Sequence, residues 1–192
     1  MSRWAGRIGL FVGGTLALGG LYLTLSRDSG APATRAHGWG FPTVMAHRGA
    51  SYLAPEETEW AYRLARATGA DFLEADIQRS KDGVLFALHD DTLERTTDAK
   101  TIYPGREKQP VSEFTWEELS RLDAGRWFNV KHPDRARPEY VGTKLLRLER
   151  LMDLALADDA PRGLYLETKS PERFPGIEAD LVKLLAARGF AA

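Results

Sequence analysis

The sequence VMAHRGASYLAPEETEWAYRLARATGADFLEADIQRSKDGVLFALHDD, residues Val44–Asp91, decides the fold of this chain. Two short and mostly apolar segments in this region are predicted as strands, and each runs into a histidine. The first, Thr43–Ala46, leads to His47, and the second, Val84–Leu88, leads to His89. Short apolar runs of this kind are typical of buried strands.

Between them, Asp71–Gln78 is predicted as a third strand, and it carries two carboxylates in its interior. Because alternate residues of a strand share a face, Glu74 and Asp76 point to one side. The apolar residues point to the other side: Leu73, Ala75 and Ile77. Two neighbouring carboxylates repel each other unless a proton or a cation lies between them. Hard oxygen ligands at this spacing suit Mg²⁺ or Ca²⁺.

The remaining pattern alternates short strands with amphipathic helices, which predicts an α/β fold with a parallel sheet. The further predicted elements are helices at residues 58–68, 148–157 and 177–188 and a strand at 163–168. In barrels of this class, functional residues lie at the carboxyl ends of the strands. Four polar residues fall at or near predicted strand ends: His47, His89, Glu167 and Lys169.

Residues 92–141 lack a clean period and contain four prolines. A short helix is predicted at Thr115–Asp123, where Thr115 and Glu118 form a capping box. We interpret this segment as an inserted cap over the site.

Residues 8–25 carry no charge over 18 positions, which is near the minimum length for a membrane span of roughly 17–25 residues. Arg3 and Arg7 precede this segment, and the positive-inside bias puts the amino terminus in the cytoplasm. The sequence thus predicts a single-pass membrane protein with its domain on the non-cytoplasmic side. A cleaved signal peptide, with a small-x-small site at Ala31–Ala33, is the alternative and gives a secreted or periplasmic protein.

These observations divide the 192 residues into an anchor or signal peptide (1–28), a linker rich in Gly, Ala, Pro and Ser (29–42) and one domain (43–192). The net charge of −1 gives no nucleic-acid footprint. The absence of cysteine excludes thiolate catalysis, disulfides and Cys-ligated zinc.

The chain resembles the glycerophosphodiester phosphodiesterase family. The matching motifs are His47-Arg48-Gly49, Pro55-Glu56-x-Thr58, Gly69-Ala70-Asp71 with Glu74-x-Asp76, Lys81-Asp82-Gly83, His89-Asp90-x-x-Leu93-x-Arg95-x-Thr97 and Leu166-Glu167-Thr168-Lys169. They occur in the family's order and at compatible spacings. The family has Asn where this chain has Glu57, a departure that affects one loop hydrogen bond.

The resemblance implies a TIM barrel, which typically needs about 250 residues. Only four strands are readable here, so we expect the chain to cover the amino-terminal half of a barrel. The implied reaction is metal-dependent hydrolysis of glycerophosphodiesters to sn-glycerol 3-phosphate and an alcohol, through a cyclic phosphate. His47 and His89 are the implied acid–base pair, since histidine titrates near neutral pH.

The resemblance also assigns Glu74, Asp76 and Glu167 to a divalent metal, Mg²⁺ or Ca²⁺. Arg48 and Lys169 are the phosphate-binding candidates, because Arg offers a bidentate fork and Lys a point charge. Glu56 belongs to the family motif and supports the metal or the substrate.

Two other interpretations stay open. In one, the same histidines and metal act on a lipid phosphodiester, as in related phospholipase-D-like toxins. In the other, the chain is a non-catalytic half-barrel that binds a partner through an unpaired sheet edge.

Overall fold

A computed structural model describes residues 31–157 and 162–190 of the chain. The chain divides into two compact units, residues 1–43 and 44–192. The described part of the first unit contains a short helix, α2 (Ala31–Ala36), inside the segment predicted as a linker.

The structure corrects the predicted location in a membrane. A helix that crosses a bilayer needs about 20 apolar residues. Within the described residues no helix is long and apolar enough to do so, and the longest, α8 (Ile177–Ala187), has 11 residues. Residues 8–25, on which the prediction rested, lie outside the described residues. The single-pass location with a non-cytoplasmic domain is therefore withdrawn.

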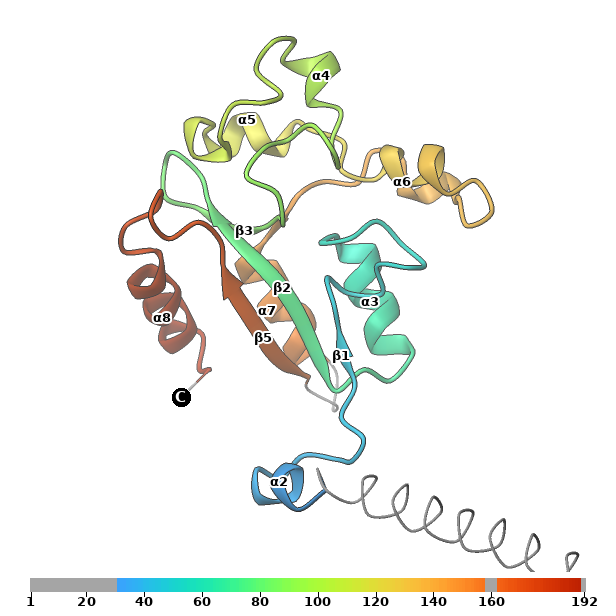
Figure 1. Ribbon diagram of the computed structural model, residues 1–192, viewed down its shortest axis with the longest axis vertical. Helices are drawn as coiled ribbons and strands as arrows, with labels where there is room; N and C mark the ends of the chain where they lie inside the picture. The colour runs from blue at the N-terminus through green and yellow to red at the C-terminus, as the bar shows by residue number, and fades with distance from the viewer. Residues whose placement is uncertain (1–30, 158–161, 191–192) are drawn as a thin grey trace, which may run out of the picture. The chain divides into compact units, whose positions relative to one another are not determined.

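The second unit is built on a five-stranded sheet around β2 (Phe72–Arg79), the long central strand of Figure 1. Parallel neighbours flank it on both sides: β1 (Met45–Ala46) and β5 (Gly163–Thr168). β3 (Leu85–Ala87) pairs antiparallel with the end of β2, and β4 (Leu146–Arg147) pairs antiparallel with β3.

The prediction of a parallel sheet is thus right for β1, β2 and β5 and wrong for the strand before His89. That strand follows β2 after a turn at Gly83, where φ is 87°. A turn this short can join only antiparallel strands, because a parallel return needs a long crossover.

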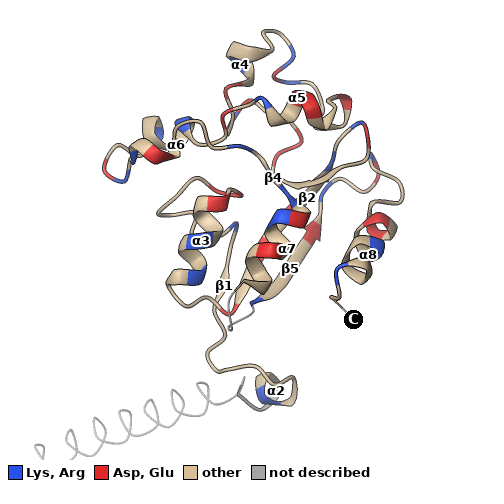
Figure 2. Ribbon diagram, turned by 180° about the vertical axis from the view of Figure 1, so that it is seen from behind, with Lys and Arg blue, Asp and Glu red and all other residues tan. Residues whose placement is uncertain are grey.

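Two helices cover one face of the strands, and both occur where the sequence predicts them. α3 (Glu59–Ala67) begins at Thr58, whose hydroxyl accepts a hydrogen bond from the Ala61 N–H. α7 (Leu148–Leu156) runs behind β2 and β5 and lies in front of them when the view is turned (Figures 1 and 2). The apolar face of β2 is fully buried in this core: Leu73, Ala75 and Ile77.

Residues 92–141 fold into short helices at one end of the sheet (Figure 1). They are α4 (Ala99–Ile102), η1 (Val111–Glu113), α5 (Trp116–Ser120), α6 (Arg126–Lys131) and η2 (Pro138–Tyr140). The predicted capping box is present, with Glu118 N–H bonded to the Thr115 hydroxyl and the Glu118 carboxylate bonded back to Thr115 N–H. The predicted helix around it is shorter than expected.

The buried carboxylate of Asp123 holds this segment together. Its Oδ1 accepts hydrogen bonds of 2.9 Å from the N–H groups of Gly125 and Arg126, and its Oδ2 accepts one of 2.9 Å from Gly142 N–H. Burial acts to raise the pKa of Asp123, but the N–H donors and the Arg126 charge outweigh it and lower that pKa.

Replacing Asp123 with Ala should lower the free energy of unfolding by about 1–3 kcal/mol at pH 7, since buried N–H groups lose their acceptor. Because the folded pKa is lowered, this stabilisation is full above the usual carboxyl pKa of 3.8 and is lost as the pH falls through the folded pKa. Thermal unfolding of the wild type and Asp123→Ala, at pH 7 and at a pH below the folded pKa of Asp123, measures the effect.

Asp134→Ala, at an exposed carboxylate, is the control and should change the free energy of unfolding by less than about 0.5 kcal/mol. Equal stabilities of Asp123→Ala and wild type at pH 7 would contradict the role given to Asp123.

Candidate active site

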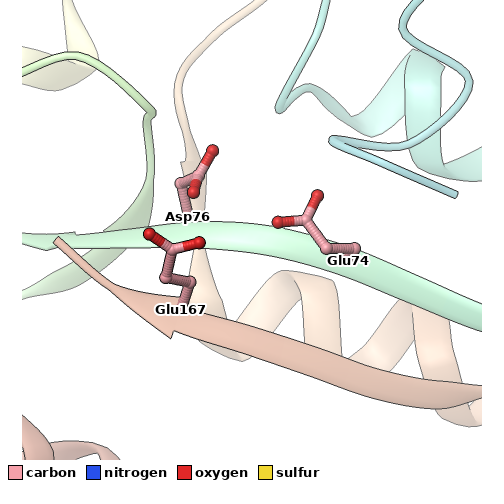
Figure 3. A group of neighbouring side chains, drawn as sticks. All are labelled: Glu74, Asp76 and Glu167. Carbon is pink, nitrogen blue, oxygen red and sulfur yellow. The ribbon is translucent and has the colours of Figure 1, made fainter. Parts of the chain in front are cut away.

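Three carboxylates from two neighbouring strands converge on one side of the sheet (Figure 3). Glu74 and Asp76 extend from β2, and Glu167 extends from β5, where it is the direct register partner of Asp76. Each offers an oxygen, and these oxygens lie within 4.8 Å of one another. Glu74 and Asp76 are buried, with 5% and 1% of their surface exposed, while Glu167 is exposed.

The turn after β1 brings a cation to these carboxylates. Arg48 has a positive φ of 56°, and its backbone N–H donates a hydrogen bond of 2.6 Å to Glu74 Oε2. Its Nε lies 3.0 Å from Asp76 Oδ2, but the geometry of this contact is not that of a hydrogen bond. The contact is therefore an ion pair between a guanidinium and an almost fully buried carboxylate.

A second cation comes from the end of β5. Lys169 Nζ lies 2.9 Å from Glu167 Oε1 and 3.5 Å from Asp76 Oδ1. The hydrogen bond with Glu167 raises the pKa of Lys169, and the same bond lowers the pKa of Glu167. Burial raises the pKa of Glu74, and the nearby charge of Asp76 raises it further.

The β2–β3 hairpin returns the chain so that His89 lies at the level of Asp76. The Leu88 N–H donates a hydrogen bond of 2.9 Å to the Asp76 carbonyl oxygen. His89 Nδ1 lies 2.7 Å from Asp90 Oδ1. Burial acts to raise the pKa of Asp90, but Arg95 and His89 outweigh it and lower that pKa. Asp90 is therefore an acceptor, so Nδ1 of a neutral His89 ring carries the hydrogen and Nε2 carries the lone pair.

A chain of ion pairs links this hairpin to the turn after β1. Arg95 binds Asp90 with Nε at 2.6 Å and Nη2 at 2.9 Å. It also binds Glu56 with Nη1 at 3.0 Å and Nη2 at 2.7 Å. Glu56 in turn accepts from Arg48 Nη1 at 3.1 Å. Glu56 thus contacts two arginines rather than belonging to the carboxylate cluster, and it joins the two histidine-bearing segments.

Each histidine lies near one of the carboxylates. The charge of His47 acts to lower the pKa of Glu74, and the charge of His89 acts to lower the pKa of Glu167. His47 is exposed, and its carbonyl oxygen accepts a hydrogen bond of 2.9 Å from the Ser51 hydroxyl. A cleft of about 270 Å³ next to His47 is lined by residues 49–53. It is open to solvent and has room for part of a small ligand.

The carboxylate cluster fits a divalent cation. Asp76 Oδ2 is buried and has no hydrogen-bond donor among the described residues. Three carboxylates face two cations, Arg48 and Lys169, so the group keeps a net negative charge when all are ionised. Oxygen donors with excess negative charge are the ligand set of Mg²⁺ and Ca²⁺.

Sequence reasoning gave no individual role to four residues that organise this site: Glu57, Tyr62, Asp90 and Arg95. Asp90 and Arg95 are visible as motif positions, but the pairing of Arg95 with Glu56 spans 39 positions. Tyr62 lies in the helix predicted at residues 58–68, and it is fully buried. No local pattern marks such partners.

Comparison with solved structures indicates a TIM-barrel-like α/β fold. A glycerophosphoryl diester phosphodiesterase of Silicibacter pomeroyi, described as putative, matches with a TM-score of 0.61 at 32% identity, over 78% of this chain and 54% of that one. A phosphodiesterase of Oleispira antarctica, solved with the product sn-glycerol-3-phosphate, matches with a TM-score of 0.59 at 31% identity, over 76% of this chain and 52% of that one.

The model of the glycerophosphoryl diester phosphodiesterase family matches residues 47–185. The chain belongs to this family. The glycerophosphodiester phosphodiesterase of Bacillus subtilis is 40% identical over 142 residues, covering 74% of this chain and 45% of the relative. A probable glycerophosphodiester phosphodiesterase of Mycobacterium tuberculosis is 38% identical over 154 residues, covering 80% and 52%. The chain thus spans about half the length of the curated relatives it matches.

Gly49 should tolerate no side chain. Its φ is 76°, and a Cβ there would lie 2.7 Å from the carbonyl carbon and the Cβ of Ala61 in α3. We expect Gly49→Ala to lower the free energy of unfolding by about 1–3 kcal/mol through steric overlap, in addition to about 1–2 kcal/mol for the left-handed backbone.

Gly83→Ala is the matched control, because its φ is 87° and no atom would lie within 4 Å of the new Cβ. Chemical denaturation of both variants separates the overlap from the backbone cost. If the two variants lost equal stability, the close approach of the Gly49 turn to α3 would be wrong.

Proposed function

We propose that this chain supplies the metal-binding and acid–base residues of a glycerophosphodiester phosphodiesterase. The reaction is metal-dependent hydrolysis of a glycerophosphodiester to sn-glycerol 3-phosphate and an alcohol. The observation that carries the proposal is the convergence of Glu74, Asp76 and Glu167 with two cations on one face of the sheet. The product bound to the Oleispira antarctica relative supports the choice of substrate class.

Glu74, Asp76 and Glu167 would hold the divalent cation, Mg²⁺ or Ca²⁺. When bound, the cation acts as a Lewis acid on the phosphate and neutralises its charge. Arg48 and Lys169 bind the phosphate oxygens. Their side chains are only 18% and 20% exposed, so their charges are little screened by solvent.

His47 and His89 are the acid–base pair. Cleavage of a phosphodiester needs a base for the attacking oxygen and an acid for the leaving oxygen. Asp90 holds the His89 ring in one tautomer by accepting from Nδ1, and Arg95 holds Asp90 in turn. Proton transfer at His89 therefore uses Nε2. Glu56 supports this arrangement through its bonds to Arg48 and Arg95 rather than by binding the metal.

Two finer features of the fold belong to this proposal. Residues 43–192 form part of a barrel domain in which β1, β2 and β5 are neighbouring barrel strands. Residues 92–141 form a cap at one end of the sheet, joined to the turn after β1 by the hydrogen bond of 3.0 Å from the Tyr140 hydroxyl to the Leu53 carbonyl oxygen. That bond lies next to the cleft beside His47, because Leu53 lines that cleft.

The direct test supplies the purified chain with Mg²⁺ or Ca²⁺ and a deacylated substrate, glycerophosphocholine. We expect sn-glycerol 3-phosphate and choline in equal amounts. A parallel assay with intact phosphatidylcholine tests the alternative activity, because a lipid phosphodiesterase would release choline from this lipid. Metal binding without any product from either substrate would favour the non-catalytic binding module.

Removing a histidine should separate chemistry from metal binding. We expect His47→Ala and His89→Ala to lower kcat by roughly 10²–10⁴-fold, the usual contribution of general acid–base catalysis, while the Kd for the metal stays within a few-fold. Steady-state kinetics and calorimetric metal titration measure both. His37→Ala, in the first unit, serves as the control. Normal turnover in either active-site variant would refute the assigned chemistry.

Removing a carboxylate or the metal should act on metal binding first. Glu74→Ala and Asp76→Ala are expected to weaken the metal Kd by at least about tenfold. Dialysis of the wild type against a chelator should abolish product formation, and added Mg²⁺ or Ca²⁺ should restore it. Full activity after chelation, with the metal content checked by mass spectrometry, would exclude the metal-dependent mechanism.

A further inference from the structure

Next to the carboxylate cluster, Glu57 carries a further carboxyl group that is buried. It is 2% exposed, and its φ is 60°. A positive φ is uncommon for residues other than glycine, and Asn, Asp and His adopt it far more often than Glu does. A glutamate in this backbone conformation therefore calls for compensating contacts.

Glu57 makes three such contacts, and each joins a different part of the site. Its backbone N–H donates a hydrogen bond of 3.1 Å to the Arg48 carbonyl oxygen. Its side-chain Oε1 accepts one of 3.0 Å from the Asp76 N–H. Its Oε2 forms a short hydrogen bond with the Tyr62 hydroxyl. One residue thus connects the turn after β1, the centre of β2 and helix α3.

Tyr62 extends this network to Glu74. Its hydroxyl lies 3.1 Å from the Glu74 carbonyl oxygen as well as next to Glu57. The Glu74 carbonyl oxygen and the Asp76 N–H are therefore both bound by one buried pair, Glu57 and Tyr62. Burial raises the pKa of Glu57 well above its usual range, and the charges of Asp76 and Glu74 add to this effect.

We propose that Glu57 is a positioning residue that, with Tyr62, fixes the spacing between Arg48 and the carboxylates of β2. It acts through its hydrogen bonds to the Asp76 peptide and the Tyr62 hydroxyl. The inference rests on the proposed metal centre and adds a residue that touches neither metal nor substrate. Loss of residues that orient metal ligands in this way typically lowers metal affinity 10–100-fold.

Glutamine is the diagnostic substitution, because it has the size of glutamate and carries no charge. Its carbonyl oxygen can accept from the Asp76 N–H, and its amide can donate to the Tyr62 oxygen. Glu57→Gln should therefore keep the metal Kd within about twofold of the wild-type value, whereas Glu57→Ala should weaken it roughly 10–100-fold. Tyr62→Phe, which keeps the ring and removes the hydroxyl, should also weaken it.

The experiment is a calorimetric titration of the full chain with Mg²⁺ and with Ca²⁺, together with thermal unfolding of the metal-free protein. The main comparison is between wild type, Glu57→Gln, Glu57→Ala and Tyr62→Phe. Glu117→Gln, at a side chain that is 78% exposed, is the matched control for the loss of a carboxylate. The Glu57→Ala, Tyr62→Phe double variant should weaken metal binding by less than the sum of the two single changes, because both changes break the contact between Glu57 and Tyr62.

The outcomes are distinct. A folded Glu57→Ala that binds metal as tightly as wild type overturns the proposal, and so does a Glu57→Gln as impaired as Glu57→Ala. If Glu57→Ala does not fold, equal metal affinities of Tyr62→Phe and Glu57→Gln overturn it. Wild-type protein that binds no metal removes the metal centre and this role together. Wild-type protein that binds metal but turns over no substrate refutes the proposed activity alone and leaves the Glu57 comparison intact.

Discussion

The parallel pairing of β2 with β5 is the constraint on which the rest of the site depends. It makes Asp76 and Glu167 direct neighbours and brings Glu74 to the same cluster. Carboxylates packed this closely repel one another unless opposite charge is supplied. Arg48 and Lys169 supply part of it from the turn after β1 and from the end of β5. The remaining negative charge is what makes the cluster suited to a divalent cation.

Rigid support behind this cluster lets it keep that geometry. The apolar side of β2 is fully buried against the helices, so the strand cannot shift without disrupting the core. Glu57 and Tyr62 bind the peptide groups of the same strand from the α3 side. Functional groups held by packed elements and by a supporting layer of hydrogen bonds stay within the narrow tolerances that catalysis requires.

Ion pairs between side chains connect the two histidine-bearing segments. The hairpin returns His89 to the level of Asp76, and Asp90, Arg95 and Glu56 then connect it to Arg48. These hydrogen bonds between charged groups are stronger and more directional than neutral ones. Burial acts to raise the pKa of Glu56, but the hydrogen bonds and charges of Arg95 and Arg48 outweigh it and lower that pKa, so Glu56 stays ionised between the two arginines. These side-chain ion pairs keep both histidines next to the carboxylates.

The sequence by itself determined the order of the main elements, although not β4 or most of the short helices of residues 92–141, and it determined which face each side chain of β2 would take. Local periodicity encodes both, because alternate residues of a strand diverge and a turn at Asp82-Gly83 is a local event. Motif order and spacing were enough to indicate the family, whose model then matched residues 47–185. The membrane location was wrong, since it rested on the length and apolarity of one segment and no described helix can span a bilayer.

Only the tertiary structure decided that β3 returns antiparallel and that Glu167 lies beside Asp76 across 91 positions. It also decided that Glu56 binds Arg95 instead of joining the carboxylates, and that Glu57 binds Tyr62. The physical reason is that such contacts depend on how distant segments pack, and no pattern within a single segment records its partner.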